Sequence, residues 1–96
     1  MRIIKKKNKI KKPFFSIITV VKNDQKNILK TIKSISNQTF KKFEYVVVDG
    51  GSTDKTVEKI KNNKFINLLL SGKDKGIYDA MNIGIKKSKG EVILFV

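Results

Sequence analysis

The sequence predicts one α/β domain in which strands and helices alternate around a mostly parallel sheet. Four short runs of β-branched and other apolar residues recur along the chain, segments with helical periodicity separate them, and polar loops follow the strands. Strands that alternate with helices of this length imply right-handed β-α-β crossovers and parallel strands. The 96 residues are enough for one small domain.

The predicted strands are nearly continuous apolar runs, a pattern typical of strands that are buried on both faces. They cover Phe14–Val21, Phe43–Val48, Phe65–Leu70 and Glu91–Val96. The last run has five apolar residues in six. We therefore expect it to be a central strand with helices on both faces.

Three amphipathic segments between these strands predict helices. Capping side chains precede the first two helices, at Asn23 or Asp24 and at Ser52, Thr53 and Asp54. The residues expected to face inward are Ile28, Leu29, Ile32 and Ile35 in the first helix, Val57 and Ile60 in the second, and Ile77, Ala80, Met81 and Ile85 in the third.

The composition is strongly basic, with 22 Lys and Arg against 8 Asp and Glu and a net charge of +14. Seven of the positive charges lie in residues 1–12, which contain no acid and are expected to form a disordered tail before a domain at residues 13–96. No apolar segment follows that tail as in a secretory signal, and no run approaches the length of a membrane span. Cys and His are absent, so chemistry must come from carboxylates, lysines, hydroxyls or the backbone, and a reducing cytoplasm is compatible with the chain.

The loop after the second predicted strand is the first candidate site. Asp49 ends the strand, and Gly50 and Gly51 follow it. We expect the Asp49 carboxylate to point into the crevice at the carboxyl ends of the strands, where it could accept hydrogen bonds from ribose hydroxyls or a base N–H. The two glycines allow a sharp turn and a close approach of a ligand. The alternative is a capping acid in an ordinary turn between strand and helix.

The second candidate is the stretch Ser71–Gly84, in which Lys75 precedes a helix and Asp79 and Asn82 share one helix face. A lysine beside a helix N-terminus suits a diphosphate, although a capping acid and a solvated face would explain the same residues. Other phosphate motifs fail. No glycine follows the first strand, and "SGKDKG" lacks the spacing of a P-loop, so a Rossmann oxidoreductase and a P-loop NTPase are disfavoured.

Together these stretches resemble the family 2 glycosyltransferases, which have the glycosyltransferase A fold, from about Phe14 to Val96. The resemblance rests on three stretches in the family's order and spacing. They are "FSIITVVKND" with "TIKSISNQTF", then "EYVVVDGGSTDKT", then "DKGIYDAMNIGIKKSKGEVILFV". It implies a Rossmann-like β-α-β-α-β-α-β arrangement that forms the nucleotide-binding half of that fold.

The resemblance also implies a nucleotide-sugar donor, UDP- or dTDP-linked, bound across the carboxyl ends of the first strands. Val21 and Asn23 match the nucleoside pocket, Asp49 matches an acid that contacts uridine, and Lys75 and Asp79 match the segment near the diphosphate and the sugar. Two departures concern the nucleoside. Residues 20–23 replace a frequent Pro-Thr-Tyr-Asn stretch, so an aromatic wall of the base pocket is missing, and Gly50 stands where the family often has a second acid.

A third departure concerns catalysis. In the family, the strand that matches Glu91–Val96 leads into paired acids that hold Mg²⁺ or Mn²⁺, and a later carboxylate serves as general base for inverting transfer. We expect these groups beyond Val96. The chain then supplies the donor-nucleotide-binding part of a larger enzyme and is inactive by itself.

Two other functions are compatible with the sequence. A truncated relic would bind nucleotide weakly and associate through an open sheet edge. A basic nucleic-acid-binding module would depend on the +14 charge, but the aromatic residues lie mostly in predicted core strands rather than between lysines, so we expect no nucleic-acid partner. For the transferase we expect a glycan or lipid-linked acceptor and a cytoplasmic location. There the basic tail could hold the enzyme at the anionic inner face of the membrane.

Overall fold

The computed structural model describes residues 1–6, 13–37 and 43–96. Within them, five strands form one sheet in the order β1-β4-β3-β2-β5. The strands are β1 (Arg2–Lys6), β2 (Phe15–Val21), β3 (Phe43–Asp49), β4 (Leu68–Ser71) and β5 (Val92–Phe95). All pairs are parallel except β1 with β4. The predicted α/β class with a mostly parallel sheet is confirmed.

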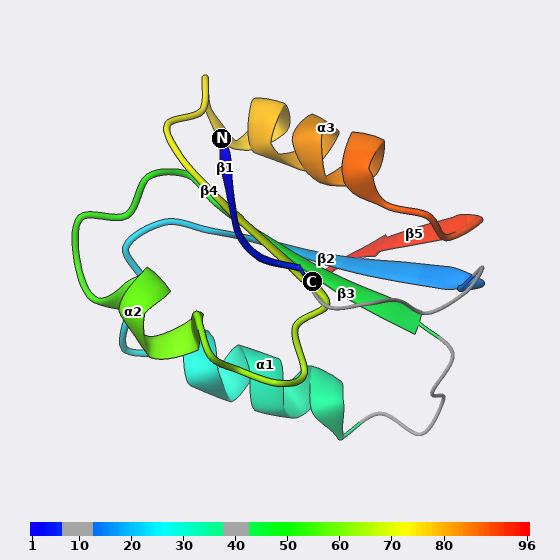
Figure 1. The fold of residues 1–96 in the computed structure, drawn as a ribbon, viewed down its shortest axis with the longest axis horizontal. Coiled ribbons are helices and arrows are strands. Elements are labelled where there is room, and N and C mark those ends of the chain that lie inside the picture. The colour runs from blue at the N-terminus through cyan, green and yellow to red at the C-terminus, as the bar shows by residue number, and fades with distance from the viewer. Residues whose placement is uncertain (7–12, 38–42) are drawn as a thin grey trace.

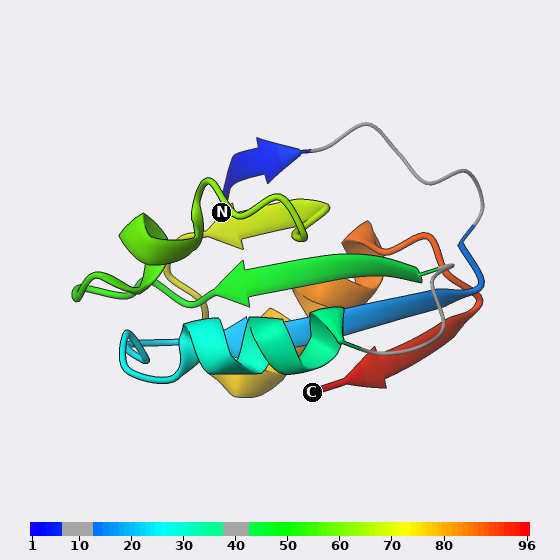
Figure 2. The ribbon, with the colours of Figure 1, turned by 90° about the horizontal axis from the view of Figure 1, so that it is seen from below.

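Three helices cover the two faces of this sheet. They are α1 (Ile28–Ser36), α2 (Thr56–Ile60) and α3 (Ile77–Lys87). Figure 1 shows α1 and α2 on one side of the sheet and α3 on the other. Figure 2 shows the strands side by side, with β1 along one edge and β5 along the other. None of the helices in the described ranges has the length and apolar character that a membrane crossing requires.

The central strand β3 is buried along its whole length and separates two apolar cores. The larger core joins the sheet to α1 and α2 through Ile28, Ile32, Ile35 and Ile60. The smaller core lies under α3 and contains Ile18, Val46, Val48, Leu70 and Ala80. The inward stripe predicted for the first helix is confirmed except for Leu29, which is exposed. In α2 the fully buried residues are Thr56 and Ile60.

The third helix is rotated from its predicted orientation. Ile77 and Ile85 were expected to face inward, but 62% and 43% of their surfaces are exposed. The buried residues of α3 are Ala80 and Gly84. A Cβ atom on Gly84 would lie 2.8 Å from Ile18 Cγ2, so the helix approaches the sheet at the one position that has no side chain. Close approach of the backbone, rather than the bulkiest residues, sets the face of this helix.

Two expectations about the ends of the sheet are wrong. Residues 2–6, expected in a disordered tail, form β1, which pairs with β4 from Arg2↔Ser71 to Lys6↔Leu68. Ile4 packs against the larger core, and Lys5 Nζ donates to the carbonyl of Asn63. Residues 7–12 lie outside the described residues. The strand at β5 was expected to be central, but it pairs with β2 at an edge, and Leu94 and Phe95 are exposed.

The predicted third strand is shorter than expected because an asparagine takes part in the ladder. The prediction began at Phe65, whereas β4 begins at Leu68. Just before it, Asn67 Oδ1 accepts a hydrogen bond from Tyr45 N at 2.7 Å, and Asn67 N donates to Tyr45 O at 2.9 Å. The side chain thus replaces a backbone partner at the point where the strand starts.

Candidate functional site

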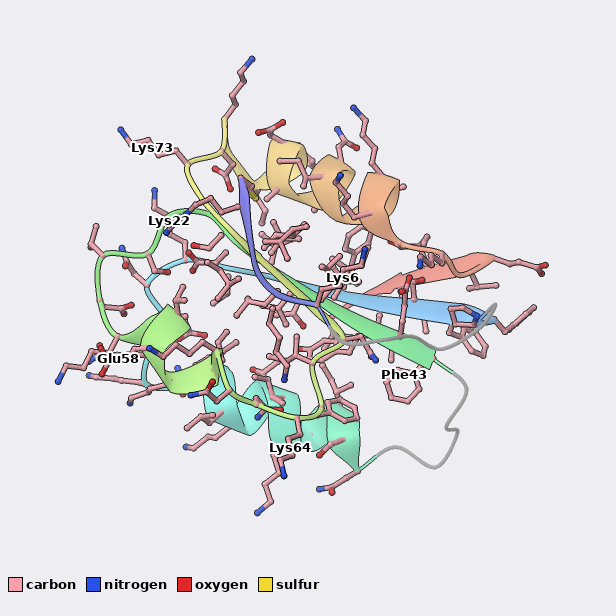
Figure 3. All side chains as sticks on the ribbon, viewed as in Figure 1. Lys6, Lys22, Phe43, Glu58, Lys64 and Lys73 are labelled. Atoms are coloured by element: carbon pink, nitrogen blue, oxygen red, sulfur yellow. The ribbon has the colours of Figure 1, made fainter. Side chains whose placement is uncertain are left out.

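The carboxyl ends of β2, β3 and β4 meet at one edge of the sheet, and their loops converge there. The loops are residues 22–27, 50–55 and 72–76. In Figure 3 the labelled side chains of Lys22 and Lys73 both project at this edge. Ligands of parallel α/β sheets bind outside the carboxyl ends of the strands, so this edge is the candidate site.

The Asp49 carboxylate lies at the centre of the edge, but it does not face an open crevice. Its residue is fully buried. One oxygen accepts hydrogen bonds from Gly51 N at 3.1 Å, Ser52 N at 3.0 Å and Ser71 Oγ at 2.9 Å, and the other accepts from Ser52 Oγ. The expected orientation toward the crevice is therefore wrong. Asp49 instead fixes the turn at residues 50–52 and joins it to β4.

Asn23 connects the first loop to the second. Its side-chain Oδ1 accepts from Thr53 N at 2.8 Å and from Asp54 N at 3.3 Å, while its backbone N donates to Ser52 Oγ at 2.7 Å. Its φ of 51° is in the left-handed region, which Asn tolerates better than most residues. The predicted site residues Asn23 and Asp49 thus share one network through Ser52.

A second set of contacts joins the same loops farther out. Asp24 N donates to Thr56 Oγ1 at 2.9 Å, and Thr56 Oγ1 donates to Asp54 Oδ1 at 2.5 Å. This side-chain hydrogen bond from Thr56, with further bonds from the backbone N–H groups of Thr56 and Gln25, lowers the pKa of Asp54 against the opposing effect of desolvation. Asp54 is therefore ionised, and its carboxylate accepts the hydrogen bonds that join these two loops.

Gly50 is the residue that lets the third loop close over the second. A Cβ atom on Gly50 would lie 2.4 Å from Asp74 Oδ2. The Asp74 carboxylate therefore occupies the space above residue 50, and its Oδ1 accepts from Gly76 N at 3.0 Å. At Gly51, with φ of 90°, a Cβ atom would lie 3.5 Å from the backbone of Lys73. The Asp74 carboxylate from the neighbouring loop thus lies where a side chain at position 50 would begin.

Lys75 and Asp79 lie together at the start of α3. Asp79 Oδ2 accepts from Lys75 N at 2.9 Å, so Asp79 caps the turn that leads into the helix. The residue Lys75 is exposed. Asn82, predicted to share the Asp79 face, is also exposed on α3. The structure therefore places a cation at the rim of the edge and holds its backbone with an acid.

Val21 belongs to the same edge through its backbone. Its side chain is buried, and its carbonyl accepts from Gly50 N at 2.9 Å. Together, Val21, Asn23 and Asp49 form one connected group. The Gly50–Asp74 contact brings the group of Lys75 and Asp79 next to it.

Sequence reasoning missed three residues of this edge: Ser71, Asp74 and Thr56. Ser71 ends β4 and donates to Asp49, a contact that depends on the register between two strands and has no local signal. Asp74 was noted only as part of a loop. The capping pattern after Asp49 is the one signal that pointed toward the Thr56 network.

At this edge the described residues form a small polar depression but no group of metal-binding side chains. A polar depression of about 260 Å³ lies beside α1 and is lined by Asn23, Asp24, Gln25, Lys26, Asn27 and Asp54. It is smaller than most small-molecule pockets. In residues 1–6, 13–37 and 43–96, no group of three or more His, Cys, Asp or Glu side chains could hold a metal ion.

This fold belongs to the doubly wound class of α/β domains. The order β4-β3-β2-β5 is the 3-2-1-4 order of doubly wound sheets, with polar and glycine-containing loops at the carboxyl ends. Comparison with known proteins gives the family. The chain belongs to glycosyl transferase family 2, whose model matches residues 16–96.

Several curated relatives are similar over most of the chain. Glycosyltransferase AglE of Haloferax volcanii is 37% identical over 90 residues, which are 88% of this chain and 30% of the relative. A PGL/p-HBAD biosynthesis glycosyltransferase of Mycobacterium tuberculosis is 40% identical over 89 residues, 88% of this chain and 34% of the relative. The chain thus spans about a third of the length of these relatives.

Solved structures agree with the fold. The crystal structure of S. aureus TarS 1–349 in complex with UDP has a TM-score of 0.71 and 34% identity, over 85% of this chain and 26% of that one. The mannosyltransferase PcManGT of Pyrobaculum calidifontis, solved with GDP-Man and Mn²⁺, has a TM-score of 0.77 at 24% identity, over the same shares. The second likeness supports the fold alone.

Proposed function

We propose that this chain forms the donor-nucleotide-binding part of a glycosyltransferase that moves a sugar from a nucleotide-sugar to a glycan or a lipid-linked acceptor. Membership of glycosyl transferase family 2 supports the reaction class. The similarity to a chain solved with UDP supports a UDP- or dTDP-linked donor. Cell-envelope glycan assembly is the setting suggested by relatives such as the PGL/p-HBAD biosynthesis enzyme.

The observation that carries this proposal is the turn built on Asp49. Four hydrogen bonds to one buried carboxylate fix residues 50–52 and β4 relative to β3. The turn places residues 50–52 at the edge of the sheet outside which ligands of parallel α/β domains bind, with Gly50 buried and Gly51 partly exposed. Asp49 therefore acts as a positioning residue for the nucleoside part of the donor, together with Asn23 and the backbone of Val21.

Lys75 has the chemistry to serve the diphosphate. In an inverting transfer the acceptor oxygen attacks the anomeric carbon, that carbon's bond to the diphosphate oxygen breaks, and negative charge builds on the leaving nucleoside diphosphate. A lysine at the site stabilises this charge. Asp79 keeps Lys75 in place through the bond to its backbone.

The described residues do not fit a divalent-metal site, so we assign them no part in holding Mg²⁺ or Mn²⁺. On the family resemblance, the metal-binding acids and the general base follow β5 along the chain. When bound, the cation would neutralise charge on the donor diphosphate. The part of the reaction assigned to residues 1–96 is to bind and orient the donor.

The test is titration calorimetry of UDP against the wild type and the variant Asp49→Asn. An amide nitrogen cannot accept the bonds that one carboxylate oxygen receives, so the turn is disturbed and we expect UDP affinity to fall about tenfold or more. Circular dichroism must show an intact fold. The control is Glu58→Gln, which neutralises an exposed acid on α2 (Figure 3) and should leave UDP affinity unchanged.

A second variant tests the proposal if Asp49→Asn does not fold. Lys75→Ala should weaken UDP more than uridine, because only UDP carries the diphosphate, while Lys86→Ala at the other end of α3 should affect neither. No UDP, dTDP or GDP binding to the wild type, or equal effects of the Lys75 and Lys86 variants, would contradict the proposal.

A further inference from the structure

The start of helix α3 exposes two large apolar side chains that the core does not use. Ile77 and Tyr78 have 62% and 78% of their surfaces exposed. The buried residues of this helix are instead Ala80 and Gly84. Single apolar residues scattered over a surface are ordinary, whereas a contiguous exposed group indicates an interaction site.

The N-terminal residue extends this exposed group. A Cβ atom on Gly72 would lie 3.0 Å from Met1 Cα, so Met1 packs against the loop that leads into α3. Met1 is itself 43% exposed. The loop and the first turn of the helix thus carry three exposed apolar side chains at the carboxyl edge of the sheet. We call these residues, together with the lysine between them, the tip: Met1, Lys73, Ile77 and Tyr78.

The charges that face outward around the tip are positive. Lys73 and Lys75 are exposed, and Figure 3 shows the Lys73 side chain projecting away from the ribbon. Both acids of the same stretch, Asp74 and Asp79, are half-buried and accept hydrogen bonds from the backbone of their own loop. Apolar side chains flanked by cations are typical of a surface that docks on an anionic bilayer, because the cations attract the headgroups and the apolar groups enter between them.

We propose that the tip docks on the surface of a bilayer that contains anionic lipid. Met1 and Ile77 enter the boundary between headgroups and acyl chains. Tyr78 lies at that boundary with its hydroxyl toward water, as tyrosines do at membrane interfaces. Lys73 contacts the headgroup phosphates, and Lys75 keeps its place at the donor diphosphate.

Docking at the tip turns the carboxyl edge of the sheet toward the membrane. The net charge alone would draw the protein to an anionic surface without fixing which face meets it, whereas the apolar side chains of the tip select one face. The candidate donor site then lies close to the membrane surface, where a lipid-linked acceptor resides. This last consequence rests on the proposed function, and docking itself does not.

The first test uses the absence of tryptophan from the chain. Tyr78→Trp gives a single reporter at the tip, and Leu29→Trp gives a matched reporter at an exposed apolar position of α1, on the other side of the sheet (Figure 1). Each variant is mixed with vesicles of equal parts phosphatidylglycerol and brominated phosphatidylcholine, whose bromine atoms quench tryptophan inside the bilayer. We expect the fluorescence of Tyr78→Trp to fall about twofold or more and that of Leu29→Trp to stay unchanged.

The second test measures how much the tip contributes to binding. In co-sedimentation with the same vesicles, the double variant Ile77→Ser and Tyr78→Ser should bind about tenfold or more weakly, because two apolar side chains no longer enter the bilayer. Leu29→Ser is the control and should bind as the wild type does. Circular dichroism and UDP titration of both variants should match the wild type, since none of these residues lies in the core or in the proposed donor site.

The outcomes separate docking from the proposed function. Unquenched Tyr78→Trp on vesicles that hold the protein, or equal quenching of Leu29→Trp, would overturn docking at the tip. An unchanged vesicle affinity of the double variant would overturn it as well, and so would a wild type that binds UDP but not the vesicles. A wild type that binds the vesicles as expected but no nucleoside diphosphate would contradict the proposed function alone.

Discussion

Three polar side chains of β3 are buried, and each is hydrogen-bonded to a neighbouring element. Glu44 Oε1 accepts from Ser16 Oγ at 2.6 Å, and Tyr45 OH donates to Thr19 Oγ1 at 2.7 Å, both in the adjacent strand β2. Asp49 completes the set at the carboxyl edge. A buried polar group without a partner costs about 1–3 kcal/mol, and in the described residues no buried side-chain N or O lacks one. These pairs therefore select one register for the sheet.

The burial of Tyr45 makes the free energy of unfolding depend on pH in the alkaline range. Desolvation by burial raises its pKa from 10.0 to about 12, although the hydrogen bond with Thr19 acts in the opposite direction. The Tyr45 hydroxyl stays protonated to a higher pH in the folded state than in the unfolded state. Its contribution to the free energy of unfolding is therefore complete below pH 10 and is lost as the pH rises toward 12. We expect the free energy of unfolding to fall by about 2–3 kcal/mol from this group.

Denaturant unfolding across that pH range measures the loss. Tyr45→Phe should remove this part of the slope, whereas Tyr78→Phe, which changes an exposed tyrosine, should retain it. Lysine deprotonation contributes equally to all three proteins. Identical slopes in the wild type and Tyr45→Phe would show that the Tyr45 hydroxyl does not titrate as proposed.

At this scale, the sequence placed the candidate residues at one edge of the sheet but did not predict the contacts that they make. Asp49 was recognised from its place between a buried strand and two glycines, and it does lie at the carboxyl edge. Its burial was not predictable, because two of its partners are the hydroxyls of Ser52 and Ser71, and the second comes from a strand 22 residues away. The contact between Gly50 and Asp74 is likewise a property of two loops, not of either sequence.

Among the elements, β5 pairs with β2 and is also fixed at its start by a hydrogen-bonded corner that follows α3. Lys89 N donates to Glu44 Oε1, and Gly90 N donates to Ser16 Oγ at 2.7 Å. A Cβ atom on Gly90 would lie 2.6 Å from Ser16 N and 2.7 Å from Phe15 C. The corner between α3 and β5 therefore packs directly on the backbone of β2, where no side chain fits.

Gly90→Ala should displace this corner. The contacts are with backbone atoms, which cannot move aside as a side chain can, so we expect the free energy of unfolding to fall by about 1–3 kcal/mol. Hydrogen exchange should show reduced protection in residues 92–95. Lys89→Ala keeps the backbone bond to Glu44 and is the control. Equal stability of the two variants would refute the packing argument.

Prediction of the elements succeeded where the pattern is local. The runs at β2 and β3 and the stripe of α1 are strong periodic signals, and the structure has these elements. The family stretch "TIKSISNQTF" lies only partly within the described residues, since 38–42 fall outside them. The failures are long-range. A run of apolar residues has the same sequence pattern in a central strand as in an edge strand such as β5. The basic residues of β1 give no strand signal until β4 offers a ladder.

For the molecule as a whole, the net charge of +14 is the main unassigned property. We expect the protein to bind vesicles that contain an anionic lipid and not neutral vesicles, at about 1 kcal/mol for each Lys or Arg near the surface. Co-sedimentation with phosphatidylglycerol-containing and pure phosphatidylcholine vesicles measures the difference.

The structure indicates which Lys and Arg residues could contact an anionic membrane. Arg2 and Lys6 belong to β1, and the Lys5 amino group is bonded to Asn63. Replacing Lys7, Lys9, Lys11 and Lys12 by Gln should weaken binding to anionic vesicles about a hundredfold or more. The control replaces Lys30, Lys33, Lys86 and Lys87, which changes the net charge equally. Equal losses in both proteins would mean that the attraction depends on the net charge and not on residues 7–12.

The two borders of the described sheet have opposite chemical character. The β1 border carries Arg2, Lys5 and Lys6, and cationic side chains on an edge strand discourage pairing with another strand. The β5 border carries the exposed apolar side chains of Leu94 and Phe95. A further strand, from this polypeptide or another, would therefore pair with β5 and would be repelled by the charges of β1.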